Sequence, residues 1–219
     1  MPLITKDAAL ERGFTPDPQA AWVLRQDGAG WVCRSERYGF VELVVVVDES
    51  GKPLYERPQY DTGSSVNVIV YGYDESRSLH VGLVLESRAH AQHPDRQGDQ
   101  LFWSIPRGFI DHGETQVEAA HREARQEMGA AVVLSTYDAG FINPEPSFVR
   151  SHYHLVFLQV DLSQIVELEL EPGEKIHRTQ FFPFGQLRNV MRKGEYEGGH
   201  FEDGVALASL LRFFLWIDE

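Results

Sequence analysis

Residues 108–130 read GFIDHGETQVEAAHREARQEMGA, a stretch whose pattern predicts a turn followed by one helix. Thr115 and Glu118 have the spacing of a capping box, in which each side chain bonds the backbone of the other residue. The helix is therefore expected to begin at Thr115. Gly129 is well placed to end it, because glycine readily adopts the left-handed conformation that follows many helices. The residues expected to form an apolar stripe toward the core are Val117, Ala120, Ala124 and Met128.

Two acidic residues, Glu123 and Glu127, lie four positions apart and are therefore expected on one side of this helix. Like charges at that spacing cost an isolated helix roughly 0.2 to 0.5 kcal/mol, so a compensating cation is expected. Magnesium prefers carboxylate oxygens and typically bridges one or two acids to substrate phosphates. Arg122 is a candidate to orient a neighbouring carboxylate through a bidentate pair. An acidic helix face is more often solvated surface, so the pair alone does not establish a metal site.

The whole pattern resembles the Nudix box, G-x5-E-x7-R-E-U-x-E-E-x-G-U, in which U is a bulky aliphatic residue. Six of the seven fixed letters of that motif are present, namely Gly108, Glu114, Arg122, Glu123, Glu127 and Gly129. The departures are Gln126, at the first acid of the paired glutamates, and the small residues Ala124 and Ala130 at two aliphatic positions. At ordinary residue frequencies a match this good arises by chance on the order of once in ten thousand sequences, so the motif is specific.

Members of the Nudix family hydrolyse a nucleoside diphosphate linked to another moiety, and they use magnesium or manganese. The resemblance therefore implies an enzyme in which metal ions neutralise the charge that develops when water attacks phosphorus. By motif position, it implies that Glu123 and Glu127 are metal ligands assisted by the backbone carbonyl of Arg107. Arg122 would orient these acids. Glu114 is a weaker ligand candidate, acting through a water molecule.

The amide of Gln126 offers a carbonyl oxygen to a metal ion but brings no negative charge. The residue is expected to weaken or remove one of several ions rather than to empty the site, because Glu123 and Glu127 remain. Gln126 also leaves a second interpretation open, in which the chain is a Nudix-fold nucleotide-sugar sensor without turnover.

Within the family, the sequence is most similar to the ADP-ribose and nucleoside-diphosphate-sugar pyrophosphatases, which release a nucleoside monophosphate and a sugar phosphate. The segment LVLESRAH resembles their strand that ends in an arginine, here Arg88, and Pro146 lies near the proline that many of them carry. The resemblance implies that Arg88 and Arg107 bind substrate. It also implies a loop glutamate as catalytic base, with Glu174 preferred over Glu171.

Two segments depart from that subgroup. Residues 143–154, NPEPSFVRSHYH, lack the glycine and the following acid usual after the proline, and PRGF at 106–109 replaces a more usual alanine–glycine pair. Dinucleoside polyphosphates and damaged nucleotides therefore stay open as alternative substrates.

Strand-like and helix-like segments follow one another around the motif. The expected strands cover residues 66–73, 79–87, 130–142, 152–162 and 175–182, and the expected further helices cover 184–194 and 203–218. Strands on both sides of single helices indicate an α/β (α+β) class, a Nudix-type α/β/α sandwich with a mixed sheet, rather than repeated βαβ units. Residues 193–203, KGEYEGGHFED, are expected to be a lid or a linker between the last two helices.

Residues 1–62 are expected to form a small β-rich subdomain, and residues 63–219 the Nudix hydrolase domain. Within the first part, the sequence predicts a short helix over 17–28, then a strand, a turn at 49–52 and a second strand. Relatives often exchange such N-terminal strands between subunits. The resemblance therefore implies that residues 1–62 serve dimerisation and that the protein is a homodimer.

The formal net charge is −13, from 33 acidic against 20 basic residues. This balance argues against a nucleic-acid polymer as partner, because such binding needs a basic face. It permits a small nucleotide substrate, because a divalent cation screens acids from phosphate oxygens. Cys33 is the only cysteine, which excludes an intrachain disulfide and favours a reducing compartment. Neither a secretory signal nor a membrane-spanning run is found, so a cytoplasmic protein without membrane contact is expected.

Overall fold

The computed structural model of this chain describes residues 23–27, 30–35, 39–47, 53–87, 100–144, 149, 152–170 and 175–218. The chain folds into two compact units. One comprises Met1–Ser64 and Asn143–His152, and the other comprises Ser65–Ile142 and Tyr153–Glu219. The motif at residues 108–130 belongs to the second unit.

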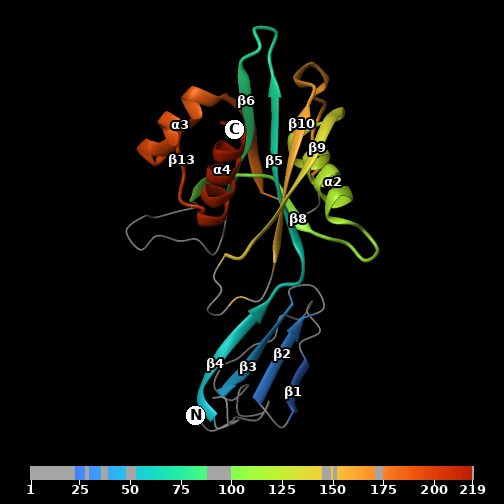
Figure 1. The fold of residues 1–219 in the computed structure, drawn as a ribbon, viewed down its shortest axis with the longest axis vertical. Helices are drawn as coiled ribbons and strands as arrows, with labels where there is room; N and C mark the ends of the chain where they lie inside the picture. The colour runs from blue at the N-terminus through green and yellow to red at the C-terminus, as the bar shows by residue number, and fades with distance from the viewer. Residues whose placement is uncertain are drawn as a thin grey trace. The chain divides into compact units, whose positions relative to one another are not determined.

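The first unit contains a four-stranded antiparallel sheet whose strands are neighbours in chain order (Figure 1). Its strands are β1 (Val23–Asp27), β2 (Gly30–Ser35), β3 (Gly39–Val47) and β4 (Pro53–Asp61). Strands β3 and β4 pair from Phe40 opposite Asp61 to Val47 opposite Pro53. The two strands predicted for the region are confirmed, and the turn predicted at 49–52 lies outside the described residues.

The helix predicted over residues 17–28 is wrong where the structure describes it, because Val23–Asp27 is strand β1. Strand β1 pairs with β2 along its whole length, and only two residues separate the two strands in the sequence. Pairing with β2 over all five residues therefore outweighs the weak helical pattern in the sequence. The part of the predicted helix before Val23 lies outside the described residues.

The second unit is built on a nine-stranded mixed sheet. Its strands are β5 (Ser65–Tyr73), β6 (Leu79–Ser87), β7 (Leu101–Ser104), β8 (Arg107–Phe109), β9 (Val133–Ile142), β10 (Tyr153–Val160), β11 (Ile176–Pro183), β12 (Glu195–Tyr196) and β13 (Gly199–His200). The main order is β12-β13-β7-β6-β5-β10-β9, while β11 pairs with β6 and β8 pairs with β5. The pairings β5–β10 and β7–β13 are parallel, which makes the sheet mixed as predicted.

Three α-helices cover the two faces of this sheet, and they are α2 (Gln116–Met128), α3 (Phe184–Lys193) and α4 (Gly204–Ile217). Helix α2 lies on one face, and α3 and α4 lie on the other (Figure 1). No helix in the described ranges is long and apolar enough to cross a membrane.

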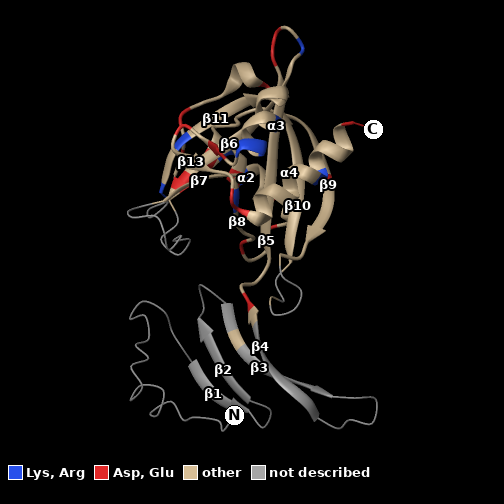
Figure 2. Cartoon of the chain, turned by 90° about the vertical axis from the view of Figure 1, so that its left-hand side faces the viewer, with Lys and Arg blue, Asp and Glu red and all other residues tan. Residues whose placement is uncertain are grey.

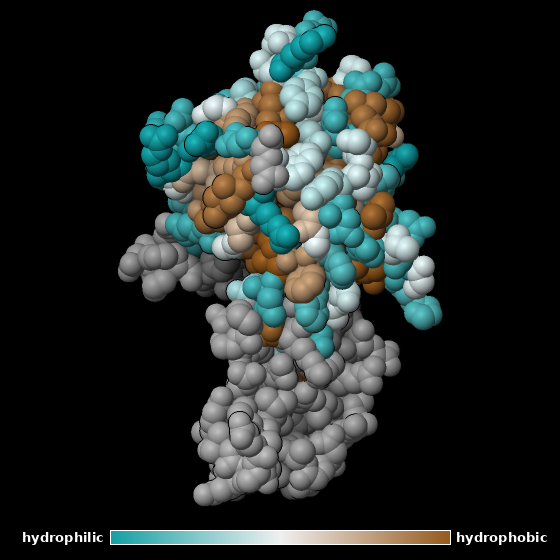
Figure 3. Space-filling model, in the orientation of Figure 1, coloured by the Kyte–Doolittle hydropathy of each residue, from teal (hydrophilic) through white to brown (hydrophobic). Residues whose placement is uncertain are grey.

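Alternation along β5 explains these layers, because successive strand side chains point to opposite faces. Val66, Val68 and Val70 share a core with the alanines of α2, whereas Ile69 and Tyr71 share the other core with residues of α3 and α4. The α/β/α sandwich predicted from the order of elements is therefore confirmed. The surface of this unit mixes polar with apolar residues (Figure 3), and its exposed apolar side chains include Leu211 and Leu215 of α4.

Residues 193–203 connect α3 to α4, as the linker alternative predicted, and within this connection they form a hairpin. Strands β12 and β13 pair across a turn in which Glu197 and Gly198 have φ values of 45° and 81°. The hairpin extends the main sheet because β13 pairs with β7. The indole Nε1 of Trp103 also donates a hydrogen bond to the Tyr196 carbonyl at 2.8 Å, which holds the hairpin against the core.

Candidate active site

Helix α2 is fixed at both ends by the residues predicted to cap it. The hydroxyl of Thr115 accepts a bond from the Glu118 amide at 3.2 Å, and the Glu118 carboxylate accepts one from the Thr115 amide at 2.8 Å. Gly129 is left-handed at φ 66°, and its amide donates to the Arg125 carbonyl at 3.0 Å. A β-carbon at Gly129 would overlap the Val166 carbonyl, so glycine is required there.

The buried face of α2 carries two acids beside its apolar residues. Glu123 is 3% exposed and Glu127 is 7% exposed. The apolar stripe differs by one residue from the prediction, because Ala119 is fully buried whereas Val117 is half-buried. Carboxylates at this depth need hydrogen-bond donors or cations, since burial of a bare charge is very costly.

Arg122 forms hydrogen bonds with several of the predicted site residues. Figure 2 shows basic and acidic residues together near β8 and α2. Arg122 Nε and Nη2 donate to the two carboxylate oxygens of Glu114, each at 3.0 Å. Its Nη1 donates to Glu123 Oε1 at 2.5 Å and to the Gln126 amide oxygen at 3.3 Å, and Nη2 also donates to the Phe109 carbonyl at 2.8 Å. The guanidinium therefore holds the loop before α2 against the acidic side of the helix.

The charges at this centre stabilise one another. Hydrogen bonding to Arg122 lowers the pKa of Glu114 despite some burial, and the Asp111 amide adds a further bond. Hydrogen bonding to Glu114, with the nearby charge of Glu123, raises the pKa of Arg122. Glu114 is thus held as a carboxylate and Arg122 as a cation at neutral pH.

Strand β8 runs directly against the two buried acids. The backbone amide of Arg107 donates to Glu127 Oε2 at 3.1 Å. A β-carbon added at the next residue, Gly108, would overlap the carboxylate of Glu123. The first glycine of the motif is therefore needed for a close approach between backbone and carboxylate rather than for an unusual φ.

The side chain of Arg107 lies among acids that the sequence did not single out. Its Nη2 donates to Asp203, to Glu86 at 3.4 Å and to the Ser104 hydroxyl at 3.0 Å. Burial by itself lowers the pKa of Arg107, but Asp203 and Glu86 outweigh that effect and raise it. In the sequence, Asp203 was only the first residue of the helix predicted over 203–218, and Glu86 only a residue of the strand predicted over 79–87.

The structure brings together Glu114, Arg122, Glu123, Gln126, Glu127 and the backbone of Arg107. It gives no test of Arg88, Glu171, Glu174 or Pro146, which lie outside the described residues. Within the described ranges, no group of three or more histidine, cysteine, aspartate or glutamate side chains is arranged to hold a metal ion.

The donor set itself fits a hard divalent cation. The carboxylates of Glu114, Glu123 and Glu127 and the amide of Gln126 supply only oxygen ligands, which magnesium and manganese prefer. The space into which a β-carbon at Gly108 would project is filled by the Glu123 carboxylate, so the backbone of β8 and the acids of α2 already share one small volume.

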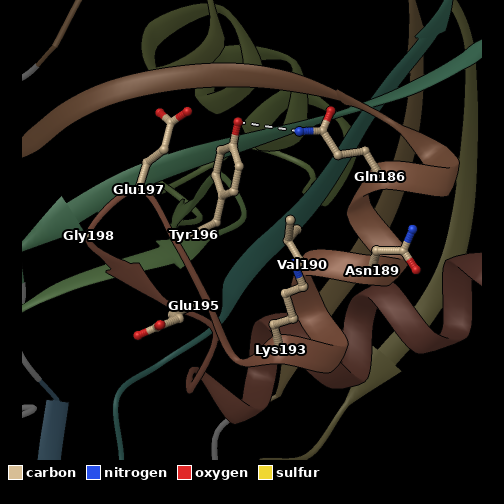
Figure 4. Close-up of a pocket in the computed structure, with 8 residues that line it drawn as sticks. All are labelled: Gln186, Asn189, Val190, Lys193, Glu195, Tyr196, Glu197 and Gly198. Atoms are coloured by element: carbon tan, nitrogen blue, oxygen red, sulfur yellow. Dashed lines mark hydrogen bonds between the residues drawn. The ribbon is translucent and has the colours of Figure 1, made fainter.

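A separate groove of about 1060 Å³ lies between α3 and the β12–β13 hairpin (Figure 4). Its lining residues are Gln186, Asn189, Val190, Lys193, Glu195, Tyr196, Glu197 and Gly198. The Gln186 amide points to the Tyr196 hydroxyl and donates to it at 3.3 Å. Of the residues predicted for catalysis or metal binding that the structure describes, none lines this groove.

Comparison with known proteins agrees with the motif and the fold. A family model described as the NUDIX domain matches residues 62–201 of this chain. No curated protein sequence matches it. Among solved structures, the chain is similar to one described as the crystal structure of an ADP compounds hydrolase, with a TM-score of 0.62 and 17% sequence identity. That likeness covers 92% of each chain, and at this identity it shows the fold alone.

Proposed function

This chain belongs to the Nudix family of hydrolases, and on that premise we propose that it hydrolyses the pyrophosphate bond of ADP-ribose or a related nucleoside diphosphate derivative. The products would be a nucleoside monophosphate and a sugar phosphate. The observation that carries the proposal is the pair of buried acids on α2, Glu123 and Glu127, held by Arg122 and by the backbone of β8. The fold of an ADP compounds hydrolase supports this substrate class.

Glu123 and Glu127 are the proposed ligands of magnesium or manganese, with Glu114, Gln126 and the Arg107 carbonyl as further oxygen donors. When bound, such a cation neutralises phosphate charge and lowers the pKa of a water molecule. The chain's own contribution is orientation. The Arg122 guanidinium holds Glu114 and Glu123, and the Arg107 amide holds Glu127, so these bonds limit the orientations that the carboxylates can take.

Arg88 is proposed to contact the substrate, and Glu174 is proposed to accept a proton from the attacking water. The resemblance gave Arg107 a substrate contact as well, but its guanidinium is bonded to Glu86 and Asp203 instead. A glutamate can serve as base when it lies within hydrogen-bond reach of the water in the substrate complex. For Glu174 this rests on the resemblance to relatives with a base in the corresponding loop. Glu171 is the alternative in the same loop.

Gln126 supports a second candidate function, a nucleotide-sugar sensor without turnover. Its amide oxygen accepts a bond from Arg122 but contributes no charge, so the acidic side of α2 has one carboxylate fewer than the family motif. We favour the enzyme because the charged residues of the motif are all present except at Gln126. Arg122 bonds Glu114 and Glu123, and the backbone of β8 bonds Glu127.

A turnover assay tests the proposal. ADP-ribose, other nucleotide sugars and dinucleoside polyphosphates are each incubated with magnesium or manganese, and the products are separated. We expect AMP and ribose 5-phosphate from ADP-ribose, and a loss of about a hundredfold or more in Glu127→Gln. Glu169→Gln is the matched control, because the Glu169 side chain forms an exposed ion pair with Arg125 of α2, the helix that carries Glu127.

The possible outcomes separate the candidates. Turnover of a dinucleoside polyphosphate but not of ADP-ribose would mean that dinucleoside polyphosphates, not ADP-ribose derivatives, are the substrates. Intact nucleotide-sugar binding without turnover of any substrate would favour the sensor. Gln126→Glu tests the altered ion complement, and an unchanged rate with unchanged metal dependence would place that residue outside the site.

A further inference from the structure

We propose that Arg107 is a positioning residue, whose guanidinium is anchored by Asp203 and Glu86 so that its own backbone amide holds Glu127. The inference rests on the proposed function, in which Glu127 is a metal ligand. It assigns roles to Asp203 and Glu86, which lie outside the Nudix motif.

The anchor begins at the N-terminus of α4. Asp203 caps this helix, because its Oδ1 accepts bonds from the amides of Val205 and Ala206 at 3.0 and 3.1 Å. Its other oxygen, Oδ2, accepts a bond from the Arg107 guanidinium and one from the Ser104 hydroxyl at 3.2 Å. The carboxylate cannot rotate away from Arg107 without losing its cap, so helix α4 sets the position of the guanidinium.

Strand β6 provides the second anchor. Glu86 lies at the end of β6, and its carboxylate accepts a bond from Arg107 Nη2 at 3.4 Å. The side chains of Arg107, Glu86 and Asp203 are 20%, 18% and 12% exposed. Charges so little exposed interact strongly, and removal of one partner leaves the others poorly solvated.

Strand β8, which carries Arg107, is held by few other bonds, one of which runs from Arg122 Nη2 to the Phe109 carbonyl at 2.8 Å. Strand β8 has three residues, and it pairs with β5 only through Ser65, Val66 and Asn67. The adjacent Pro106 carbonyl accepts one further bond, from Val68 at 2.9 Å. A short strand of this kind is easily displaced, so the guanidinium anchor governs how well the Arg107 amide stays within 3.1 Å of Glu127 Oε2.

Contact with a substrate phosphate and positioning of Glu127 are different roles for the Arg107 side chain, whose bonds to Glu86 and Asp203 are all made by Nη2. The two roles therefore make different predictions. A substrate contact affects the Michaelis constant for the nucleotide, whereas a positioning contact affects metal affinity and the backbone of β8 before any nucleotide binds.

The test uses the full chain and three variants. Asp203→Asn removes the charge that anchors Arg107 but keeps a side chain that caps helices well. Arg107→Lys keeps a cation but lacks the planar fork that reaches several partners at once. Glu169→Gln removes an exposed ion pair of α2 and is the control. Hydrogen exchange of the Arg107 amide is measured in metal-free protein by NMR, and Mn²⁺ affinity is measured by calorimetry.

We expect Asp203→Asn to speed exchange of the Arg107 amide and to weaken Mn²⁺ binding by about 10- to 100-fold, with the nucleotide Michaelis constant nearly unchanged. Arg107→Lys should have a smaller effect in the same direction, and the control none. Unchanged exchange and Mn²⁺ affinity in Asp203→Asn, or a change in the Michaelis constant alone, would overturn the inference. Failure of the unsubstituted protein to bind Mn²⁺ would instead reject the proposed metal site. The exchange rate of the Arg107 amide, measured without metal, would still show whether Asp203 anchors Arg107.

Discussion

Gly108 lies where the backbone of β8 leaves no room for a side chain beside Glu123 of α2. An added methyl group there would overlap the Glu123 carboxylate, which is also bonded to Arg122. We expect Gly108→Ala to lower turnover at least about tenfold and to destabilise the fold by about 1 to 3 kcal/mol, because a crowded site must shift its neighbours. Steady-state kinetics and urea denaturation measure the two effects.

Gly185→Ala is the control for that substitution. Gly185 lies in α3, and a β-carbon there would meet no atom within 4 Å. Alanine favours a helix over glycine, so this variant should be as stable as the parent or slightly more stable. Equal losses in both variants would mean that the crowding at Gly108 has no special consequence.

Single residues differ in how far the sequence could predict their partners. Arg122 and Glu114 are eight positions apart, and a motif with a helix cap between them brings them together locally. Arg107 is 21 positions from Glu86 and 96 from Asp203. Those contacts depend on which strands and helix ends become neighbours, so no local pattern could have predicted them.

Among the elements, helix α2 depends on its capping box for a defined start. Thr115→Ala removes the hydroxyl that accepts the Glu118 amide bond, and we expect a loss of about 1 kcal/mol in the free energy of unfolding. Because the two side chains cap each other, Glu118→Ala added to this variant should cost less than it does alone. Strict additivity in urea denaturation would contradict a shared cap.

The same cap predicts a pH dependence. Bonds from the Thr115 amide and then from its hydroxyl lower the pKa of Glu118 below 4.5, its ordinary value. A carboxyl group with a lowered pKa in the folded state stabilises the fold above its unfolded pKa and loses that contribution as the pH falls through the folded value. Glu118→Gln should therefore be less stable than the parent at neutral pH and equally stable well below pH 4.5. A difference that stays constant with pH would contradict this.

Helix ends were predictable because capping is local, and both Thr115 and Gly129 behave as expected. Strand β1 was not predicted, because five residues with a mixed pattern carry little periodicity and acquire their structure by pairing with β2. The hairpin at residues 193–203 was missed for the same reason. Its two-residue strands pair with each other, and β13 also pairs with β7.

For the molecule as a whole, the layer architecture followed from the order of strands and helices, but the sheet order did not. Strand β5 pairs in parallel with β10, whose first residue is 88 positions later, and β11 returns to pair with β6. Pairings over such separations depend on side-chain packing in the two hydrophobic cores, one on each face of the sheet. The sequence motif could place the acids on one helix face, but not the sheet edges around them.

The expected homodimer is a prediction at the same scale. Light scattering of the purified chain should give twice its mass of 24.9 kDa. A chain lacking residues 1–62 should lose this association if the N-terminal strands form the contact. A mass of 24.9 kDa at all concentrations of the full chain would contradict the dimer.

The most direct measurement is the rate of ADP-ribose hydrolysis after metal removal. Protein treated with EDTA and then dialysed is assayed alone and during titration with Mg²⁺ or Mn²⁺. The proposed site predicts no release of AMP without the ion, a saturable return of activity on its addition, and no return in Glu123→Gln or Glu127→Gln. An undiminished rate in excess EDTA would contradict a metal-dependent reaction at the acids of α2.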